Sequence, residues 1–486
     1  MTVKLDDPDL LRADAFVAGE WRPARSGARF PIQNPASGEI LAEVADLSGP
    51  EAAEAIEAAS RAFPAWRSLT AKARSEALHR WSGLILSAKE DLARLMTAEQ
   101  GKPLAETRGE VAYGAAFIDW FAEEARRIYG DVIPSHKDGA RILVLKQAVG
   151  VVGAVTPWNF PNAMITRKAA PALAAGCVFL VKPAEETPLS ALALAELSRR
   201  AGLPAGVFNV LPSTRAQEVG AELTGHPLVA KFSFTGSTAV GKKLMAQCAA
   251  GVKKVSLELG GNAPFIVFDD ANLEAAVAGA MVSKYRNMGQ TCVCANRFLV
   301  QENVYDAFAG LLEERVAGMR VGDGAEEGIE QGPLISEEAV RKVERLIAEA
   351  VSKGARVRLG GHRHSLGGTF FEPTVVSDVA PDMAIAQEEI FGPVATLTSF
   401  TDEDEAVALA NATPYGLAAY FYSRDIGRIF RVAEALEYGM VAVNDGLLST
   451  EVAPFGGVKQ SGLGREGSKY GIEEYLEVKY VLLGGL

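Results

Sequence analysis

The sequence predicts an α/β protein of at least two domains, and three observations support this prediction. The chain has 486 residues, more than one hydrophobic core usually serves. Strand and helix patterns alternate from residue 150 onward, as they do in parallel sheets with crossover helices. Hydrophobic residues make up 48% of the chain and charged residues 23%, the balance of a folded globular protein, so extensive disorder is excluded.

The first part of the chain is mainly helical by its pattern. Residues 1–50 mix short strand-like pieces with turn residues, which predicts a hairpin region. From Pro50 the apolar residues recur at helical spacing, and helical patterns continue over residues 71–98 and 109–129. Strand candidates follow at residues 140–147 and, much later, at residues 475–483. Two alternatives stay open for this pair: the strands pair within one sheet, or they form a protruding piece that binds another subunit.

Two series of strand and helix units make up the rest. The first has expected strands at residues 151–155, 178–182, 207–211 and 229–234, with helices at 163–175, 188–201 and 215–224. Such units are compatible with a nucleotide-binding sheet but do not establish one. The second, after Gly261, has expected strands at 264–268 and 297–300 and helices at 273–285 and 304–317. No Ser- or Pro-rich linker separates them, so we expect tightly packed lobes with a cleft between them and a boundary near residue 260.

Charge and cysteine usage exclude several classes of protein. A net charge of −12 argues against nucleic acid or an acidic membrane surface as the main partner, although a local pair of arginines can still attract a small anion. The four cysteines have the spacing of neither a disulfide framework nor a zinc site, so no metal is expected. The N-terminus lacks the apolar core of a signal peptide, and no run approaches the ~18 apolar residues of a membrane span. We therefore expect a cytoplasmic protein.

Cys292 stands in a polar setting. A thiol with a pKa of about 8.5 is mostly protonated at neutral pH, so a nucleophilic cysteine needs surroundings that activate it. Most free cysteines in intracellular proteins are small buried apolar residues, and this alternative stays open. It is weakened by Gly289, Gln290 and Thr291, because a core strand or helix seldom carries such a run.

Polar residues follow three of the expected strands. Asn159 comes after the first and is placed to aim an amide N–H at an oxyanion; the alternative is an Asx turn. Lys182 and Glu185 come after the second, where such side chains can bind a cofactor ribose and a carboxylate repels a 2′-phosphate. Residues 234–241 form a glycine-bearing turn that opens a helix, which is either a pyrophosphate site or an ordinary tight turn.

Three further stretches complete the set. Glu258 lies between leucines and before Gly260, and a carboxylate in an apolar setting has a raised pKa that suits a general base acting on water. The alternative is an exposed glutamate at a strand end. Residues 389–393 and 454–466 are, on their own, only turn-forming segments.

Taken together and in this order, these motifs resemble the aldehyde dehydrogenase superfamily over nearly the whole chain. The resemblance implies an α/β fold with a Rossmann-type cofactor domain, an α/β catalytic domain and a small protruding oligomerisation hairpin. The cofactor domain would comprise residues 1–127 and 148–260, the catalytic domain residues 261–474, and the oligomerisation strands residues 128–147 and 475–486. A homodimer or homotetramer is the expected assembly.

The resemblance also implies residue roles. Cys292 would be the nucleophile and Glu258 the general base, with Asn159 and the Cys292 backbone N–H as the oxyanion hole. Lys168 and Glu466 match the family's proton-relay pair. The residues implied in cofactor binding are Thr156, Pro157, Trp158, Lys182, Glu185, Gly236, Ser237, Glu389 and Phe391. NAD is expected over NADP, because Glu185 stands where phosphate-accepting relatives carry a small hydroxyl residue.

Three polar positions narrow the expected substrate. Arg167, Arg286 and Ser449 look like the residues with which the succinate-semialdehyde branch of the superfamily holds a distal carboxylate, and Phe160 and Phe455 are expected beside them. The alternative for both arginines is a structural salt bridge. The expected reaction is NAD-dependent oxidation of succinate semialdehyde through a thiohemiacetal and a thioester, with glutarate semialdehyde or a broader aldehyde range as the alternative.

Three alternatives concern the chemistry. The family's coenzyme A-acylating branch lacks the glutamate at position 258, so Glu258 favours a free-acid product. Cys294 is either a small apolar residue or the partner of Cys292 in a reversible disulfide. From other classes, a cysteine hydrolase without a dinucleotide and a non-catalytic scaffold remain as rivals; the cofactor motifs count against the first and the intact catalytic residues against the second.

Overall fold

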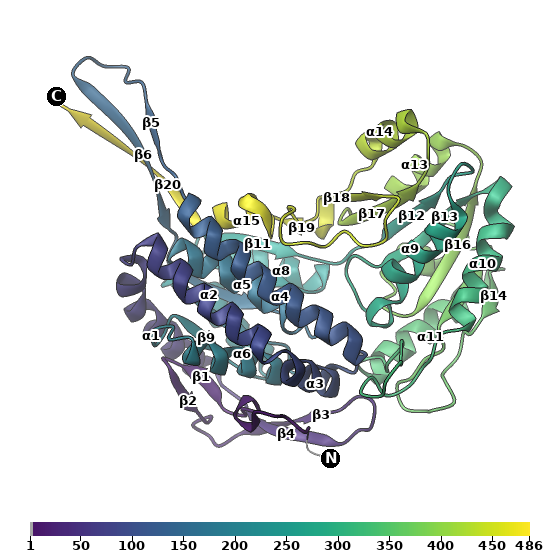
Figure 1. The fold of residues 1–486 in the computed structure, drawn as a ribbon, viewed down its shortest axis with the longest axis horizontal. Coiled ribbons are helices and arrows are strands. Elements are labelled where there is room, and N and C mark those ends of the chain that lie inside the picture. The colour runs from purple at the N-terminus through teal and green to yellow at the C-terminus, as the bar shows by residue number, and fades with distance from the viewer. Residues whose placement is uncertain (1–2) are drawn as a thin grey trace.

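The computed structural model describes residues 3–486 and has two lobes, each built on one large sheet. An eight-stranded sheet forms the first lobe and a seven-stranded sheet the second, while a three-stranded sheet projects from the first lobe as a narrow arm (Figure 1). The α/β class and the two-lobed arrangement expected from the sequence are confirmed. Among the described residues no helix is both long and apolar enough to cross a membrane.

The first sheet has the strand order β19-β11-β10-β7-β8-β9-β1-β2. Its strands are β1 (Ala15–Val17), β2 (Glu20–Arg22), β7 (Val151–Val155), β8 (Val178–Lys182), β9 (Phe208–Val210), β10 (Val229–Thr235), β11 (Lys254–Glu258) and β19 (Gly462–Leu463). β7 to β11 run parallel, so their carboxyl ends share one edge, where ligands bind in sheets of this kind. A two-stranded ribbon, β3 (Arg29–Gln33) and β4 (Ile40–Ala45), lies near the N-terminus.

Helices surround this sheet. They are α1 (Gly49–Arg67), α2 (Ala71–Ser87), α3 (Lys89–Gln100), α4 (Leu104–Glu124), α5 (Ala163–Ala175), α6 (Pro188–Arg200), α7 (Ala216–Gly225) and α8 (Thr238–Ala249), with short 3-10 turns η1 (Pro8–Leu10) and η2 (Ala125–Arg127). The helical stretch expected over residues 71–98 is two helices, because the backbone leaves helical geometry at Ala88. Every residue of α5 is buried, which is why Arg167 and Lys168 on it need partners inside the protein.

The second sheet has the order β14-β15-β16-β13-β12-β17-β18. Its strands are β12 (Ala263–Val267), β13 (Ala295–Gln301), β14 (Arg356–Leu359), β15 (Thr374–Ser377), β16 (Val394–Phe400), β17 (Ala418–Tyr422) and β18 (Met440–Val443). Its helices are α9 (Leu273–Tyr285), α10 (Tyr305–Ala317), α11 (Glu337–Ser352), α12 (Ala384–Gln387), α13 (Glu403–Asn411) and α14 (Ile426–Ala435), with 3-10 turns η3 (Arg286–Gly289) and η4 (Glu302–Val304). Its strands are parallel except β14.

The chain then returns to the first lobe. After η5 (Lys459–Ser461), β19 pairs antiparallel with β11, so that Gly462 lies opposite Glu258. Helix α15 (Ser468–Glu473) follows and packs on α4 and α5. This return places Glu466, which lies between β19 and α15, close to α5.

The projecting arm contains both distant strand candidates. β20 (Leu476–Gly484) pairs antiparallel with β6 (Ala140–Ala148) along its whole length, and β5 (Asp131–Ile133) pairs with the other edge of β6. The two strands therefore pair within one sheet, and that sheet also protrudes (Figure 1). Apolar side chains on it are exposed, among them Val132, Val478 and Tyr480.

Candidate active site

Cys292 lies where two cavities meet. One cavity has a volume of about 740 Å³ and the other about 270 Å³, and Cys292 and Met164 line both. The residue is half-buried in the loop between η3 and β13. Cys292 is therefore a cavity-lining residue rather than part of the closed core.

The loop before Cys292 has an unusual backbone conformation that side-chain hydrogen bonds hold in place. Asn287 and Met288 have φ of 50° and 54°, in the left-handed region that residues with a side chain seldom adopt. The Asn287 side chain is held on both sides: its Nδ2 donates to the Asn159 carbonyl at 2.9 Å, and Gln100 Nε2 donates to its Oδ1 at 3.0 Å. These bonds keep the loop in one conformation.

Asn159 reaches across to the same loop. Its Nδ2 donates to the Gln290 carbonyl at 2.9 Å, two residues before Cys292, and the side chain is buried. The contact is long-range, so the Asx-turn alternative does not describe this side chain. An amide nitrogen carries two hydrogens, so one remains for a ligand.

Glu258 ends β11 with a buried side chain, so the alternative of an exposed strand-end glutamate is wrong. Neither carboxyl oxygen has a hydrogen-bond partner among residues 3–486. Burial, together with the nearby charge of Glu466, raises the pKa of Glu258 well above its usual value. Burial likewise raises the pKa of Cys292 to about 12, so the resting thiol is protonated and needs a base.

Glu466 is held by two cations of α5. One carboxyl oxygen is paired with Lys168 Nζ and the other approaches Arg167 Nε, and all three side chains are buried. Arg167, Lys168 and Glu466 therefore form one buried charge cluster, which reaches the narrow cavity through Arg167. Lys168 and Glu466 line neither cavity.

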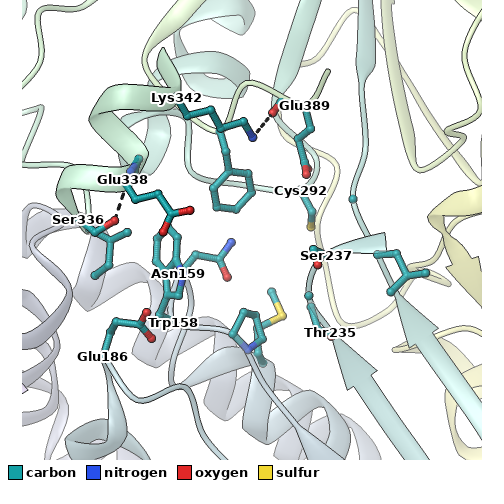
Figure 2. A pocket seen from close by; sticks show the side chains of 18 of the residues that line it. Trp158, Asn159, Glu186, Thr235, Ser237, Cys292, Ser336, Glu338, Lys342 and Glu389 are labelled. Atoms are coloured by element: carbon teal, nitrogen blue, oxygen red, sulfur yellow. Dashed lines mark hydrogen bonds between the residues drawn. The ribbon is translucent and has the colours of Figure 1, made fainter. Parts of the chain in front are cut away.

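Six of the nine expected cofactor residues line the wide cavity. They are Pro157, Trp158, Gly236, Ser237, Glu389 and Phe391. Figure 2 shows Trp158, Ser237 and Glu389 around this cavity together with Cys292. The N-terminus of α8 opens into it: Ser237 is the N-cap residue and accepts a hydrogen bond from Val240 N at 3.4 Å.

Several features of this cavity fit a dinucleotide. Its volume and its position at the carboxyl ends of parallel strands are those of a cofactor site. A Cβ at Gly236 would lie 2.4 Å from the tip of the Phe234 ring, so glycine lets the chain pass there without moving that ring. The α8 N-terminus that follows attracts anions. The buried hydroxyl of Thr235 has no partner among the described residues, which leaves a polar group free for a ligand.

Thr156, Lys182 and Glu185 do not line the wide cavity. Lys182 Nζ donates to the Pro183 carbonyl at 3.1 Å and to Glu185 Oε2 at 3.3 Å, and Glu185 is exposed. The neighbouring Glu186 does line the cavity and was missed, although the adjacent acidic pair at the strand end was a usable signal. Residues of α11 were also missed, because no strand end or glycine turn marks them; they are Glu338, Ala339, Arg341, Lys342 and Arg345.

The narrow cavity is lined by all five expected substrate residues, namely Phe160, Arg167, Arg286, Ser449 and Phe455. The guanidinium carbon of Arg286 lies 5.3 Å from the centroid of the Phe160 ring, and within residues 3–486 it forms no ion pair. The salt-bridge alternative therefore does not hold for Arg286. It holds in part for Arg167, whose Nε approaches Glu466 but whose Nη2 has no hydrogen-bond partner in the described chain.

Four residues of α4 also line the narrow cavity and were not expected. They are Glu106, Gly109, Glu110 and Tyr113. Glu106 accepts a hydrogen bond from Asn287 N at 2.8 Å, and burial raises its pKa to about 7. Helical spacing on a long helix gave no signal for any of them.

Cys294 lies outside both cavities. It is buried, its Sγ is 3.3 Å from Lys284 Nζ, and the same ammonium donates to Asn296 Oδ1 at 3.1 Å. All four cysteines are free. Within residues 3–486 no three His, Cys, Asp or Glu side chains gather as metal ligands.

The site thus combines a thiol and a buried carboxylate with a wide cavity suited to a dinucleotide and a narrow one suited to an anion. This arrangement defines an enzyme that forms a covalent intermediate beside a bound cofactor. A family model described as "Aldehyde dehydrogenase family" matches residues 21–481, and the chain belongs to this family.

Relatives with close similarity carry different names. The chain is 60% identical over 484 residues to a glutarate-semialdehyde dehydrogenase of Pseudomonas aeruginosa, covering 100% of both chains. It is 60% identical to a 3-sulfolactaldehyde dehydrogenase of Pseudomonas putida, covering 100% of this chain and 99% of the relative. It is 59% identical to the NADP(+) succinate-semialdehyde dehydrogenase of Escherichia coli, covering 99% and 100%. A crystal structure of an E. coli NADP-dependent enzyme superposes with a TM-score of 0.98 at 59% identity, covering 99% and 100%.

These comparisons confirm the fold and the class of enzyme expected from the motifs. The chain is an aldehyde dehydrogenase, so the scaffold and cysteine-hydrolase alternatives fall away. The family uses NAD or NADP, and the E. coli relative is named for NADP. The comparisons therefore support a nicotinamide dinucleotide without deciding between the two forms.

Proposed function

We propose that this aldehyde dehydrogenase oxidises a short ω-carboxy aldehyde, succinate semialdehyde or glutarate semialdehyde, to the dicarboxylate. One observation supports the substrate class above all: Arg167 and Arg286 line the same small cavity, and that cavity ends at Cys292. Guanidinium groups form strong, charge-assisted hydrogen bonds with carboxylates. The names of two relatives fit this class, since succinate and glutarate semialdehyde each have a carboxylate at the other end, while the third relative is named for an aldehyde with a sulfonate there.

The substrate carboxylate would bind Arg286 and the free Nη2 of Arg167, with Ser449 as a further hydrogen-bond donor. Phe160 and Phe455 would flank the methylene groups, because both line the same cavity. This places the aldehyde carbon beside the Cys292 sulfur.

The first chemical step forms the thiohemiacetal. The thiol proton passes to solvent water, the Cys292 sulfur bonds to the aldehyde carbon, and the carbonyl oxygen becomes an oxyanion. The second N–H of Asn159 and the backbone N–H of Cys292 stabilise this oxyanion. The prior bond from Asn159 to Gln290 fixes the amide in place before substrate arrives.

The wide cavity would hold the dinucleotide through Trp158, Ser237, Glu389 and the α8 N-terminus. When bound, the nicotinamide supplies the acceptor for the hydride that leaves the substrate carbon. Glu258 then takes a proton from water, the resulting hydroxide adds to the thioester, and the carbon–sulfur bond breaks to give the acid. Lys168 and Glu466 would carry the proton away from Glu258.

We also propose a preference for NAD over NADP. Glu185 and Glu186 follow β8 at the sheet edge, and Glu186 lines the wide cavity. A carboxylate there repels a 2′-phosphate. The E. coli relative, by contrast, is named for NADP.

The same proposal assigns the dinucleotide to residues 1–127 and 148–260 and the nucleophile to residues 261–474. The projecting arm of β5, β6 and β20 would join subunits in a homodimer or homotetramer, because exposed apolar residues on a sheet edge favour pairing with a second copy. Light scattering of the purified protein measures the assembly, and a monomer would contradict this part.

The test of function compares matched aldehydes. The purified protein is assayed for dinucleotide reduction with succinate semialdehyde, glutarate semialdehyde and their uncharged analogues butanal and pentanal. We expect kcat/KM to be about a hundredfold higher for the semialdehydes, as lost charge-assisted bonds imply. Equal values for charged and uncharged aldehydes would contradict the proposed substrate class.

A further inference from the structure

Arg167 faces two different partners from one position in α5. Its side chain is 1% exposed, its Nε approaches Glu466, and its Nη2 has no partner among the described residues. The guanidinium carbon lies 4.0 Å from the centroid of the Phe455 ring in the narrow cavity. One guanidinium therefore separates the substrate cavity from Glu466.

The two partners of Arg167 are tied together by the backbone. Phe455 N donates to the Glu466 carbonyl at 2.8 Å, and Glu466 N donates to the Phe455 carbonyl at 2.7 Å. The cavity wall and the buried carboxylate are thus parts of one rigid pair. Arg167 therefore contacts two groups that the backbone holds together.

Glu466 in turn belongs to the charges around Glu258. Burial and the charge of Glu466 raise the pKa of Glu258, while nearby cations lower it. These cations are Arg167 and Lys168 on α5 and Arg465 beside Glu466. Cys292 and Tyr113 also lie near this cluster and interact with Arg167. On its other sides, Tyr475 interacts with Glu466 and Lys231 interacts with Lys168.

We propose that Arg167 is a positioning residue for hydrolysis of the acyl-enzyme as well as a ligand for the substrate carboxylate, because the guanidinium that lines the narrow cavity also holds Glu466 beside the base. The inference rests on the proposed function in one respect: Glu258 must be the base that activates water. It adds that the guanidinium of Arg167 serves both substrate recognition and hydrolysis of the acyl-enzyme.

Arg286 supplies a matched comparison. It lines the same cavity, but among residues 3–486 it has no ion pair and does not touch Glu466. If both arginines served only as carboxylate ligands, their loss would have the same effect on a substrate without a carboxylate. If Arg167 also acts through Glu466, the two variants differ on that substrate.

The experiment uses p-nitrophenyl butyrate, which has no carboxylate and needs no dinucleotide. The Cys292 sulfur bonds to the ester carbon, the bond to the nitrophenolate oxygen breaks, and the thiol proton passes to the solvent. Water then hydrolyses the butyryl-enzyme. The steady release of nitrophenol after the first turnover, measured against pH, reports this hydrolysis for wild type, Arg167→Gln and Arg286→Gln.

We expect Arg167→Gln to move the acidic limb of the profile upward by about one pH unit. Loss of a nearby positive charge raises the Glu258 pKa, and Glu258 works only when deprotonated, so activity is lost at a higher pH. Arg286→Gln leaves the limb at its wild-type position. A limb that is unmoved in Arg167→Gln, or moved equally in both variants, would overturn the inference.

Two controls keep the result decisive. If Arg167→Gln does not fold, Glu466→Gln tests the same link: loss of a negative charge should move the limb to lower pH, and an unmoved limb overturns the inference. Glu258→Gln should abolish the limb; if the limb persists, the assigned base is wrong and the proposed function fails with it. Because the assay contains no aldehyde and no dinucleotide, an unmoved Arg167→Gln limb refutes only the coupling.

Discussion

Asn159 Nδ2 donates a hydrogen bond to the Gln290 carbonyl at 2.9 Å and so joins the two lobes at the nucleophile. Asn159 follows β7 of the first sheet, whereas Gln290 precedes Cys292 in the second lobe. Asn287 strengthens the contact by donating from its own amide to the Asn159 carbonyl. The Asn159 amide and the Cys292 thiol are therefore held in fixed relative positions before any ligand binds. Electrostatic stabilisation of a transition state requires such prior positioning.

Replacement of the nucleophile gives the first prediction. Cys292→Ala should abolish reduction of the dinucleotide with succinate semialdehyde, because no covalent intermediate can form. Its thermal midpoint should stay close to that of wild type, since Cys292 is half-buried at a cavity wall. Unchanged turnover, measured by absorbance of the reduced dinucleotide, would rule out this nucleophile.

The base separates the two halves of the reaction. Glu258→Gln should leave a burst of about one reduced dinucleotide per site and then slow turnover strongly, because thioester hydrolysis lacks its base. Rapid-mixing absorbance resolves the two phases. Equal losses in both phases would mean that Glu258 acts on the thiol rather than on water.

Wild-type turnover should also depend on pH through Glu258. Burial and Glu466 place its pKa well above that of an ordinary carboxyl group. The base works when deprotonated, so the rate is full above this raised pKa and falls as pH drops through it. The acidic limb of the kcat profile should thus lie clearly above about 4.3, the usual glutamate value; a limb at or below that value would argue against a buried base.

Cofactor choice tests the acidic pair after β8. If the carboxylate at 185 repels a 2′-phosphate, Glu185→Ser should raise kcat/KM for NADP relative to NAD by about tenfold, the size expected of one unfavourable charge contact. Glu186→Ser is the matched variant, because Glu186 rather than Glu185 lines the wide cavity. A larger shift in Glu186→Ser would transfer the role to that residue, and wild-type kcat/KM at least as high with NADP would refute the preference.

Cys294 gives a redox prediction. Its Sγ lies 3.3 Å from Lys284 Nζ, and this contact lowers the pKa of Cys294, but burial outweighs it and raises the pKa above the usual value. Attack of the Cys294 thiolate on an oxidised Cys292 should therefore become faster as the pH rises. Peroxide should inactivate the enzyme with loss of two hydrogens by mass, reversible by dithiothreitol, and Cys294→Ala should lose this mass change. Peroxide inactivation without a dithiothreitol-reversible mass change would show that Cys294 is only a small packing residue.

Local sequence motifs predicted most of the site residues, because each motif lies at a strand end or a glycine turn. The expected helices at residues 163–175 and 273–285 match α5 and α9. Gly176, in the left-handed conformation, ends α5, and the Asn272 side chain caps the start of α9. The α11 residues were missed for the opposite reason, because they approach the wide cavity from a helix face that no local pattern marks. Glu186 was missed although the acidic pair after β8 indicated this position, since the expectation was placed on Glu185.

The amino-acid sequence by itself determined the α/β alternation, the turn chemistry and the identity of the reactive groups, because these depend on residues close together along the chain. Tertiary structure alone decided that Cys292 lies between two cavities, that Glu258 is buried without a partner, and that Arg167 meets Glu466. Those relationships join residues about a hundred to three hundred positions apart through sheet pairing and packing. Their energies depend on burial, which strengthens charge interactions and which no local pattern reveals.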